Sequence, residues 1–309
     1  MSPVSPGDAP HSEDVAAIIV TYFPDLQRLQ RLLESLVPQV TRIFVVDNTG
    51  DASLLLSDTL GSGAILIPLK ENLGIAAAQN IGARAAMDSA SRFVLLLDQD
   101  SLPAADMVPR LVSAWRSLTF AGNRVAAVGP RVLGRSGPAG FIRFGGLRRN
   151  IVHAAPSEHW VRCDMLIASG TLISMDSLAQ VGGMNEALFI DKVDTEWCLR
   201  ASARGLLHFG VPHATMDHAL GHQDARAWIF GWRTFAVSRP FRYYYIFRNF
   251  FLVRRMPHAT SRWCRAEGVE CLKSLVYFGL VSGQRWANAI MMARGIADGL
   301  RGISGPMRR

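Results

Sequence analysis

Two aspartates separated by one glutamine follow an apolar run at residues 94–101, which read VLLLDQDS. Carboxylates this close repel each other, and an unpaired one at the end of a dry strand is costly. Three interpretations are open for this stretch alone. It is a solvated turn, because Asp and Ser are ordinary turn residues. Alternatively, Asp98 and Asp100 share a divalent cation, or one of them is a nucleophile with a neighbouring acid.

The nucleophile interpretation fits the sequence poorly. Phosphatases of the haloacid dehalogenase type follow Asp-x-Asp with Thr or Val two positions on, whereas Leu102 stands there in this chain. The apolar run is also the fourth expected strand rather than the first. A dinucleotide enzyme is equally disfavoured, because the first strand runs into TYFPD and no G-x-G-x-x-G motif follows it.

The spacing of apolar residues predicts the elements that position these acids. Strands and helices alternate, which implies βαβ units, a mostly parallel sheet and hence an α/β fold. Ligands of such sheets bind beyond the carboxyl ends of the strands, and Thr21, Asp47, Asn72 and Asp98 all fall at that edge. The expected strands are 15–20, 43–46, 64–67, 93–97, 125–132 and 165–175, and the expected helices are 26–36, 75–87 and 193–204.

Composition indicates a globular chain with an appendage. Of the 309 residues, 49% are hydrophobic and 19% charged, which excludes a disordered protein. We expect a disordered leader over 1–13, a catalytic domain over 14–225 and a helical extension over 226–309. The leader has no apolar core of a signal peptide, and no uncharged run approaches the roughly 18–20 residues of a membrane span. Four cysteines without a CxxC pair indicate a reducing compartment, so we expect a cytoplasmic protein.

Basic residues are concentrated in the last part of the chain. From Arg226 onward there are 15 Lys and Arg against 3 Asp and Glu, whereas the preceding residues carry a slight acidic excess. Aromatic residues are interleaved with these arginines, as in WRTFAVSRPFRYYYIFRN. Nucleic acid, a polyphosphate or an anionic membrane surface would suit such a segment. No nucleic-acid reader motif is recognisable, so we do not expect nucleic acid as a partner.

Several motifs in this order resemble one enzyme family. They are IIVTYFPD, VVDNTGD, ENLGIAAAQNIGA, VLLLDQDS, GTLISMDSLAQVGGMNEALFIDKVDTEWCLRA and DHALGH. Together they resemble family 2 glycosyltransferases of the GT-A fold, over roughly residues 14–256. LLLDQDS, LFIDKVDTEWCLR and YYYIFRN are similar to the bacterial rhamnosyltransferases that use dTDP-L-rhamnose, including those of rhamnolipid synthesis.

The resemblance implies an activity. It would be inverting transfer of L-rhamnose from dTDP-L-rhamnose, with Mg²⁺ or Mn²⁺, to a hydroxyl of a lipid or glycan acceptor such as a rhamnolipid or O-antigen precursor. The enzyme would sit peripherally on the inner face of the cytoplasmic membrane. Two alternatives stay open: a family 2 transferase with another nucleotide sugar, and a non-catalytic protein that binds nucleotide sugars or polyanions. The sequence predicts no oligomeric state.

The resemblance also assigns roles to residues. Asp194 would be the catalytic base and Glu196 its reserve, although Val193 stands where the family usually has Glu. The residues expected at the donor are Thr21, Tyr22, Asp47, Asn72, Gly74, Asn80, Asp98 and Gln99. The expected metal ligands are Asp98, Asp100 and His218.

Each assignment has a structural alternative. Asp47 begins a stretch, DNTG, that would form a plain turn unaided, and Asn80 would equally suit a residue that only caps or packs within its helix. His218 would equally suit a surface or core histidine. Asp194 would also be favoured by the helix dipole alone, and the arginines of 228–255 could snorkel from an ordinary core.

Overall fold

The computed structural model describes residues 15–50, 60, 63–134, 137–155, 157–218, 223–228, 232–237, 239–281 and 284–308. The expected leader, 1–13, lies outside these described residues. The side chains of His218, of 223–228 and of 232–237 are likewise outside the description.

Four parallel strands form one half of the main sheet, in the order β3-β2-β1-β4. They are β1 (Val15–Thr21), β2 (Arg42–Asp47), β3 (Ile65–Pro68) and β4 (Phe93–Asp98). Thr21 pairs in register with Asp47, and Val20 pairs with Asp98. The polar residues that end these strands therefore reach one edge together, as the sequence predicts.

The other half of the sheet is mixed. Next to β4 lies the antiparallel β11 (Leu172–Ser174), followed by β6 (Val125–Gly134), β12 (Leu207–His218) and β10 (Val161–Cys163). Short β5 (Ser101–Pro103) and β7 (Gly137–Pro138) pair with β12 and β6, and β8 (Phe141–Phe144) and β9 (Arg149–Val152) form a separate hairpin. The strand expected over 165–175 is confined to its last part, because 166–171 turn across the end of β4.

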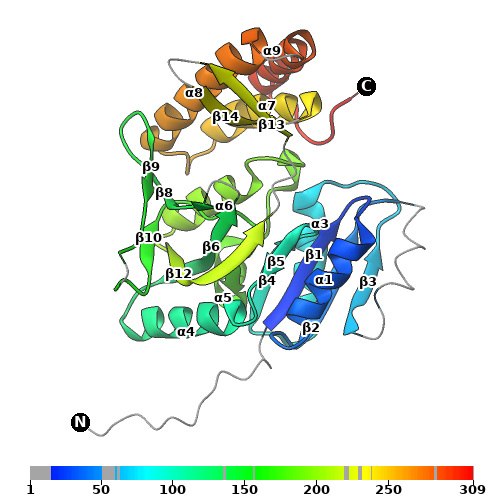
Figure 1. Cartoon of the computed structure of the whole chain (residues 1–309), viewed down its shortest axis with the longest axis vertical. Coiled ribbons are helices and arrows are strands. Elements are labelled where there is room, and N and C mark those ends of the chain that lie inside the picture. Colours follow the sequence, from blue (N-terminus) through cyan, green and yellow to red (C-terminus); the bar gives the residue numbers. More distant parts are fainter. Residues whose placement is uncertain are drawn as a thin grey trace, which may run out of the picture.

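Helices cover both faces of the sheet (Figure 1). One face packs against α1 (Leu26–Leu36) and α4 (Met107–Phe120), and the other against α3 (Ile75–Asp88), α5 (Met175–Val181) and α6 (Val193–Ala203). Alternate residues of β1 enter the two cores: Ile19 packs with α1, and Ile18 packs with α3. Burial on both faces explains why the strand sequences are continuously apolar.

The C-terminal part begins with strands. β13 (Gln223–Trp228) and β14 (Trp232–Val237) form an antiparallel hairpin, where the sequence analysis expected helix from residue 226. Helical structure starts later, with α7 (Pro240–Arg254), α8 (Ser261–Val276), the π-helical turn η5 (Tyr277–Val281) and α9 (Arg285–Arg301). Alternating residues such as those of WRTFAV suit a strand better than a helix.

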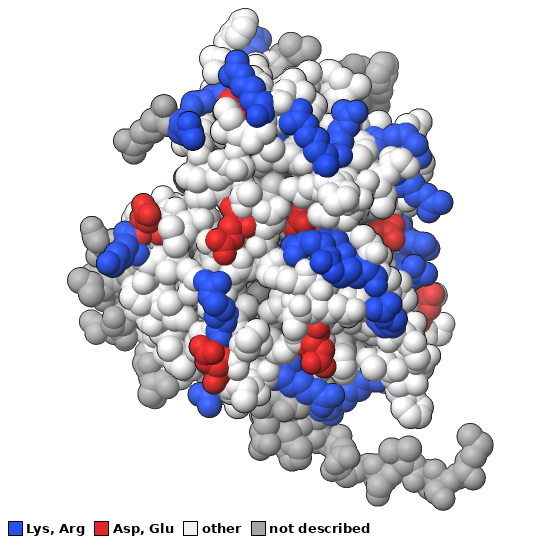
Figure 2. All heavy atoms as spheres, turned by 180° about the vertical axis from the view of Figure 1, so that it is seen from behind, with Lys and Arg blue, Asp and Glu red and all other residues white. Residues whose placement is uncertain are grey.

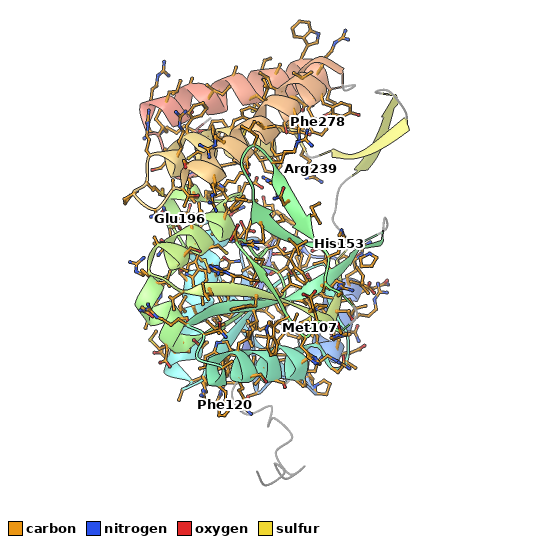
Figure 3. The ribbon with its side chains drawn as sticks, turned by 90° about the vertical axis from the view of Figure 1, so that its left-hand side faces the viewer. Met107, Phe120, His153, Glu196, Arg239 and Phe278 are labelled. Atoms are coloured by element: carbon orange, nitrogen blue, oxygen red, sulfur yellow. The ribbon has the colours of Figure 1, made fainter. Side chains whose placement is uncertain are left out.

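The C-terminal helices are joined to the α/β domain by a shared core. Phe247 and Phe250 of α7 belong to the same apolar cluster as α3 and α6. Gly295 lets α9 approach α7, because a Cβ there would lie 2.4 Å from the Tyr244 carbonyl oxygen. The helices stand above the sheet in Figures 1 and 3. Among the described residues, no helix is long and apolar enough to cross a membrane.

Candidate active site

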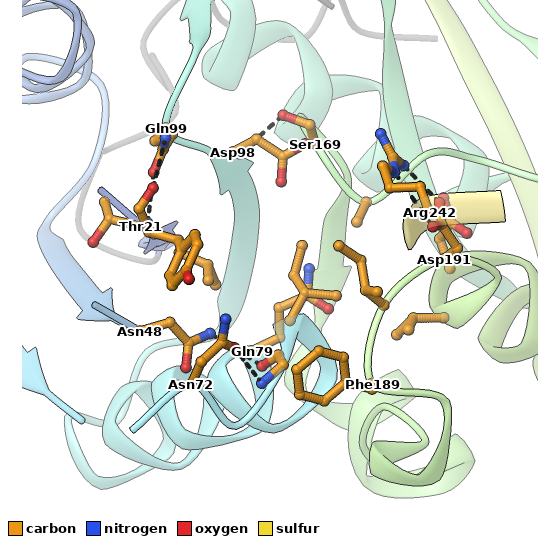
Figure 4. Close-up of a pocket in the computed structure, with 18 of the residues that line it drawn as sticks. Thr21, Asn48, Asn72, Gln79, Asp98, Gln99, Ser169, Phe189, Asp191 and Arg242 are labelled. Carbon is orange, nitrogen blue, oxygen red and sulfur yellow. Dashed lines mark hydrogen bonds and ion pairs between the residues drawn. The ribbon is translucent and has the colours of Figure 1, made fainter. Parts of the chain in front are cut away.

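A pocket of about 780 Å³ opens at the carboxyl ends of the parallel strands (Figure 4). One side, which we call the strand-end wall, is formed by residues that follow β1, β2 and β4 and by the start of α3. The opposite side, the loop wall, is formed by residues 189–194 and by Arg239, Phe241 and Arg242 at the start of α7. The pocket thus lies between the predicted ligand-binding edge and the C-terminal helices.

Thr21, Tyr22 and Gln99, three of the residues expected at the donor, line the strand-end wall. The Tyr22 amide N–H donates to Gln99 Oε1 at 2.7 Å, and Gln99 Nε2 donates back to the Tyr22 carbonyl at 3.3 Å. This exchange ties the segment after β1 to the turn after β4. Half of the Tyr22 side chain is exposed, so its ring is available to a ligand.

Asp47 lies behind this wall rather than on it. Its carboxylate is fully buried and accepts hydrogen bonds from the hydroxyls of Thr21 and Thr49, each at 2.7 Å. In this arrangement Asp47 supports Thr21. The donor contact that the family resemblance implies for Asp47 would require the carboxylate to become accessible.

Asn48 lines the pocket next to Asp47, and the sequence analysis missed it. Its Oδ1 accepts the Leu73 N–H at 3.1 Å, and its Nδ2 donates to the Gly74 carbonyl at 3.2 Å. Asn72 Oδ1 accepts the Gly74 N–H at 2.9 Å. The two asparagines therefore hold the ENLG turn, and the Asp-Asn pair after β2 was the signal that could have revealed Asn48.

Gly74 is required where the two walls meet. Its φ of +85° favours glycine, and a Cβ there would lie 2.5 Å from the Phe189 ring. The Ile75 N–H, at the N-terminus of α3, donates to the Phe189 carbonyl at 2.8 Å. Asn80, one and a half turns further, instead packs its helix: its amide contacts the Met184 backbone and Glu186, so its structural alternative describes its position better.

Asp98 and Asp100 both line the pocket, on the tight turn that joins β4 to β5. The Asp98 N–H donates to Ser169 Oγ at 3.1 Å, and that hydroxyl lies 2.5 Å from Ser101 Oγ. The stretch is therefore a turn, as the plainest interpretation has it. Because this turn faces the pocket, both carboxylates are also placed for ligand binding.

The loop wall has an unusual backbone. Phe189, Asp191 and Lys192 all have φ near +65°, a region in which residues other than glycine are rare. Such conformations cost about 1 to 3 kcal/mol each and are maintained only by their surroundings. This strained segment leads directly into α6, whose first turn carries Asp194.

Asp194 lies in the pocket and is partly buried. Burial raises the pKa of its carboxyl above the usual range, while the Thr195 N–H at 2.7 Å and the nearby Lys192 oppose that rise. A carboxylate with a raised pKa is a stronger proton acceptor than an ordinary aspartate. Asp194 therefore shares the pocket with Asp98 and Asp100, and its role as the base stays a prediction.

Arg242 faces these acids from α7, and sequence analysis did not assign it to the site. Its guanidinium pairs with Asp191 through Nη2–Oδ1 at 2.6 Å and Nε–Oδ2 at 3.3 Å (Figure 4). Burial alone would lower the pKa of Arg242. The negative charge of Asp191 and, more weakly, of Asp98 and Asp194 outweighs this effect, so the pKa of Arg242 is raised. The pocket therefore combines carboxylates with a fixed cation.

Comparisons with known proteins identify the chain. A family model described as glycosyl transferase family 2 matches residues 17–167. The dTDP-rhamnosyl transferase RfbF of Shigella flexneri is 33% identical over 303 residues, a match that covers 95% of this chain and 98% of that protein. This chain belongs to glycosyl transferase family 2. The family resemblance drawn from the sequence motifs is confirmed.

Solved glycosyltransferase structures share the fold of this family 2 member. GalNAc-T7 with UDP, GalNAc and Mn²⁺ superposes with a TM-score of 0.55 at 14% identity, covering 85% of this chain and 56% of that one. S. aureus TarS 1-349 in complex with UDP-GlcNAc gives 0.54 at 14% identity, covering 94% and 81%. The chain spans little more than half of the GalNAc-T7 chain. At these identities the likeness confirms the predicted GT-A-like α/β fold.

Two predicted site residues of this transferase remain, Glu196 and His218. Glu196 is 1% exposed and pairs with Arg200 through Nε–Oε1 at 2.8 Å and Nη2–Oε2 at 2.9 Å, so it is occupied inside the domain (Figure 3). His218 ends β12 beside Ser101, but its side chain is outside the described residues. In the described part of the chain, no three His, Cys, Asp or Glu side chains form a ready metal cluster.

Proposed function

We propose that this enzyme transfers L-rhamnose from dTDP-L-rhamnose, with inversion, to a hydroxyl group of a lipid-linked glycan or glycolipid. The observation that carries the proposal is the match to a dTDP-rhamnosyl transferase along nearly the whole of both chains. The pocket supports it, because carboxylates and polar turns meet at the strand ends where nucleotide ligands of α/β folds bind.

The strand-end wall would hold the nucleotide. Tyr22 offers an exposed aromatic face on which a pyrimidine can lie, and Asn48 and Asn72 fix a turn that would lie beside the sugar and phosphates. The N-terminus of α3 lies beside this turn, and its helix dipole favours negative charge. These features suit a nucleoside diphosphate rather than a neutral ligand.

Asp98 and Asp100 would hold Mg²⁺ or Mn²⁺. Their donor set fits the group, because two carboxylates that line one pocket supply the hard oxygen ligands these ions prefer, and donor phosphates complete the shell. The bound metal would neutralise the charge that develops on the departing nucleotide diphosphate. Arg239, which makes no ion pair or side-chain hydrogen bond within the described residues, adds positive charge on the opposite wall.

Asp194 would act as the base. An inverting transfer is one displacement: the acceptor oxygen bonds to the anomeric carbon as the bond to the nucleotide diphosphate breaks. The hydroxyl loses its proton in that step, and a positioned base contributes about 10²–10⁴-fold. Asp194 lines the pocket on the wall opposite the two metal-binding candidates, so its basicity would be preserved.

The C-terminal helices would bind the anionic inner face of the cytoplasmic membrane. Along α9, Trp286, Ile290 and Leu300 are 75%, 61% and 52% exposed at helical spacing, and on α8 Leu272 and Val276 are 60% and 50% exposed. We call these five residues the apolar face. Arginines and lysines gather on the upper part of Figure 2, which these helices occupy. Apolar anchors with a basic surround are typical of interfacial helices.

Ligand-dependent stabilisation tests the donor assignment. We expect dTDP-L-rhamnose to raise the melting temperature in the presence of Mg²⁺ or Mn²⁺, since a ligand bound only by the native state stabilises it. UDP-glucose, UDP-GlcNAc and GDP-mannose serve as competing donors. A larger rise in melting temperature with one of these nucleotide sugars would identify it as the donor instead. Binding without transfer to any lipid or glycan hydroxyl would favour the non-catalytic alternative.

A further inference from the structure

The motif YYYIFRN, residues 243–249 on α7, has no role in the proposed chemistry, yet it ends in two fully buried polar side chains. Arg248 and Asn249 are both 0% exposed. Within the described residues Arg248 has no carboxylate partner, which is exceptional for a buried cation because desolvating an unpaired charge is costly. A specific arrangement of neutral partners must compensate it.

Backbone carbonyls and aromatic rings supply that compensation. Arg248 Nη2 donates to the Leu188 carbonyl at 2.9 Å, and Nη1 donates to the Gly305 carbonyl. The guanidinium carbon lies 5.3 Å and 4.8 Å from the ring centres of Tyr244 and Tyr245, within cation–π range. The charge is thus held between the strained loop wall and the segment after α9.

Asn249 fastens the same loop wall from the next position. Its Nδ2 donates to the carbonyls of Leu188, Ile190 and Asp191 at 2.9, 2.8 and 2.8 Å. These carbonyls belong to the segment in which Phe189, Asp191 and Lys192 have positive φ. The side-chain amide of Asn249 therefore holds the part of the loop wall that has unfavourable backbone angles.

Residues 305–307, which follow α9, close the arrangement from the other side. The Gly305 N–H donates to the Ala187 carbonyl at 2.7 Å, and the Met307 N–H donates to the Tyr245 hydroxyl at 2.8 Å. Tyr245 in turn stacks on Phe189, with ring centres 5.3 Å apart and planes at 18°. More than a hundred residues separate this segment from the loop it contacts.

We infer that Arg248, Asn249 and residues 305–307 form a bracket that positions the loop wall, and through it Asp194, for transfer. The inference rests on the proposed function for the role of Asp194. These are positioning residues, because none of them lines the pocket. If the bracket opens, the strained backbone relaxes and the base loses its alignment, while the strand-end wall keeps its own contacts. Misplacing a catalytic group by about 1 Å can reduce a rate 10²-fold.

The test is a variant that ends at Ile303, compared with a matched variant that lacks only Arg308 and Arg309. Both keep Ile303, whose N–H caps α9 on the Asp298 carbonyl at 2.9 Å. Calorimetry with dTDP counts binding-competent sites, and transfer from dTDP-L-rhamnose to octyl α-L-rhamnoside is then expressed per site. Hydrogen exchange of the backbone amides at 186–194 reports the loop wall without any turnover.

We expect the variant ending at Ile303 to lose at least tenfold in kcat per site, with a dTDP Kd within about twofold and faster exchange confined to 186–194. The matched control should stay within twofold of wild type. Tyr245→Phe, which removes only the hydroxyl that Met307 contacts, should shift both readouts in the same direction by a smaller factor. If the variant that ends at Ile303 does not fold, the results for Tyr245→Phe decide whether the bracket exists.

Unchanged kcat per site together with unchanged exchange at 186–194 would overturn the bracket. A loss seen only as fewer dTDP-binding sites would also overturn it, because it would show general destabilisation. If the wild-type chain neither binds dTDP nor transfers rhamnose, the proposed function fails instead, and the exchange comparison still decides whether residues 305–307 hold the loop.

Discussion

The two walls of the pocket are built by different physics. The strand-end wall follows from parallel pairing, which brings Thr21, Asp47 and Asp98 to one edge, and from short-range hydrogen bonds within polar turns. The loop wall contains three residues with positive φ and is held by side chains of α7 about sixty positions later. The strand-end wall is held by regular sheet pairing and by polar turns, whereas the loop wall is held by side chains of α7 that contact an irregular backbone.

This difference separates two kinds of damage. A change on the strand-end wall should act on the ligand or metal that it contacts and leave the rest of the domain intact. A change in the residues that support the loop wall should instead lower the free energy of unfolding or misalign the catalytic base. The reason is that a strained backbone persists only while its surroundings enforce it.

The largest expected effect is on the strand-end wall. Asp100→Ala removes one of the two pocket carboxylates on the turn after β4, so turnover should fall at least 10³-fold while the melting temperature of the unliganded protein changes little. Initial rates with added Mg²⁺ or Mn²⁺, and after treatment with EDTA, measure this. If EDTA does not reduce the activity, or if Asp100→Ala is fully active, the proposed metal site at Asp98 and Asp100 is wrong.

Support of the loop wall is tested next, through Glu267. This carboxylate is 2% exposed and pairs with both Lys192 of the loop wall and Arg149 of β9. Glu267→Gln leaves two cations without their partner, so the free energy of unfolding should fall by about 3–5 kcal/mol. Urea unfolding at pH 7 measures it. Glu270→Gln, which breaks the exposed pair with Lys273, is the control and should cost no more than about 1 kcal/mol.

The same carboxylate predicts a pH dependence. Burial alone would raise the pKa of Glu267, but Lys192 and Arg149 outweigh it and lower the pKa below the ordinary glutamate range. A depressed folded-state pKa stabilises the protein above the unfolded-state pKa, and this contribution is lost as pH falls through the folded value. The difference in free energy of unfolding between wild type and Glu267→Gln, which we call the stability gap, should therefore decrease as the pH is lowered. A gap that is constant from pH 7 to pH 3 would contradict the ion pairing.

The contact between the two walls is tested at Gly74. Gly74→Ala places a methyl group 2.5 Å from the Phe189 ring, so we expect donor affinity to fall about tenfold as Phe189 is displaced. Gly122→Ala also places an alanine at a positive φ, +82° against +85°, but a Cβ at Gly122 meets open space. Calorimetric Kd values for dTDP-L-rhamnose separate the two effects. Equal affinities in both variants would mean that the contact with Phe189 does not matter for the donor.

The smallest expected effect concerns the apolar face of α8 and α9. Trp286→Ala should weaken binding to phosphatidylglycerol-containing vesicles about fivefold, measured by sedimentation at low and at high salt, because a 75%-exposed tryptophan would supply much of the proposed interfacial contact. Phe120→Ala, on α4 and 97% exposed, is the control for a solvent-facing aromatic residue. Wild-type protein that binds at neither salt concentration would leave this face without a membrane role.

Much of the strand-end wall could be predicted from the sequence because its signals are local. Apolar runs marked β1, β2 and β4, and the polar residue after each run marked the edge. The orientation of individual side chains was beyond such patterns: Asp47 turns inward to Thr21 and Thr49, while its neighbour Asn48 faces the pocket. Neighbouring residues at a strand end point to opposite sides, and the hydrogen bonds that choose between them come from other segments.

The loop wall was only partly predictable for the same reason. LFIDKVD and its Asp194 were visible as a motif, but the conformation of 189–192 is imposed by Arg248, Asn249 and the segment after α9. Arg242 was read as part of a basic surface, although it pairs with Asp191 inside the pocket. Partners separated by fifty or more residues leave no mark in local spacing.

The central claim is that Asp194 on the loop wall is the base of an inverting rhamnosyl transfer, and Asp194→Asn tests it most directly. Asparagine keeps the shape but cannot take the proton, so kcat should fall about 10²–10⁴-fold with the dTDP-L-rhamnose Kd within about threefold of wild type. Because burial raises the pKa of Asp194, the wild-type kcat should also fall with decreasing pH from a point above the ordinary aspartate range. Near-normal turnover of Asp194→Asn, with activity lost instead in Glu196→Gln, would contradict the account and move the base to Glu196.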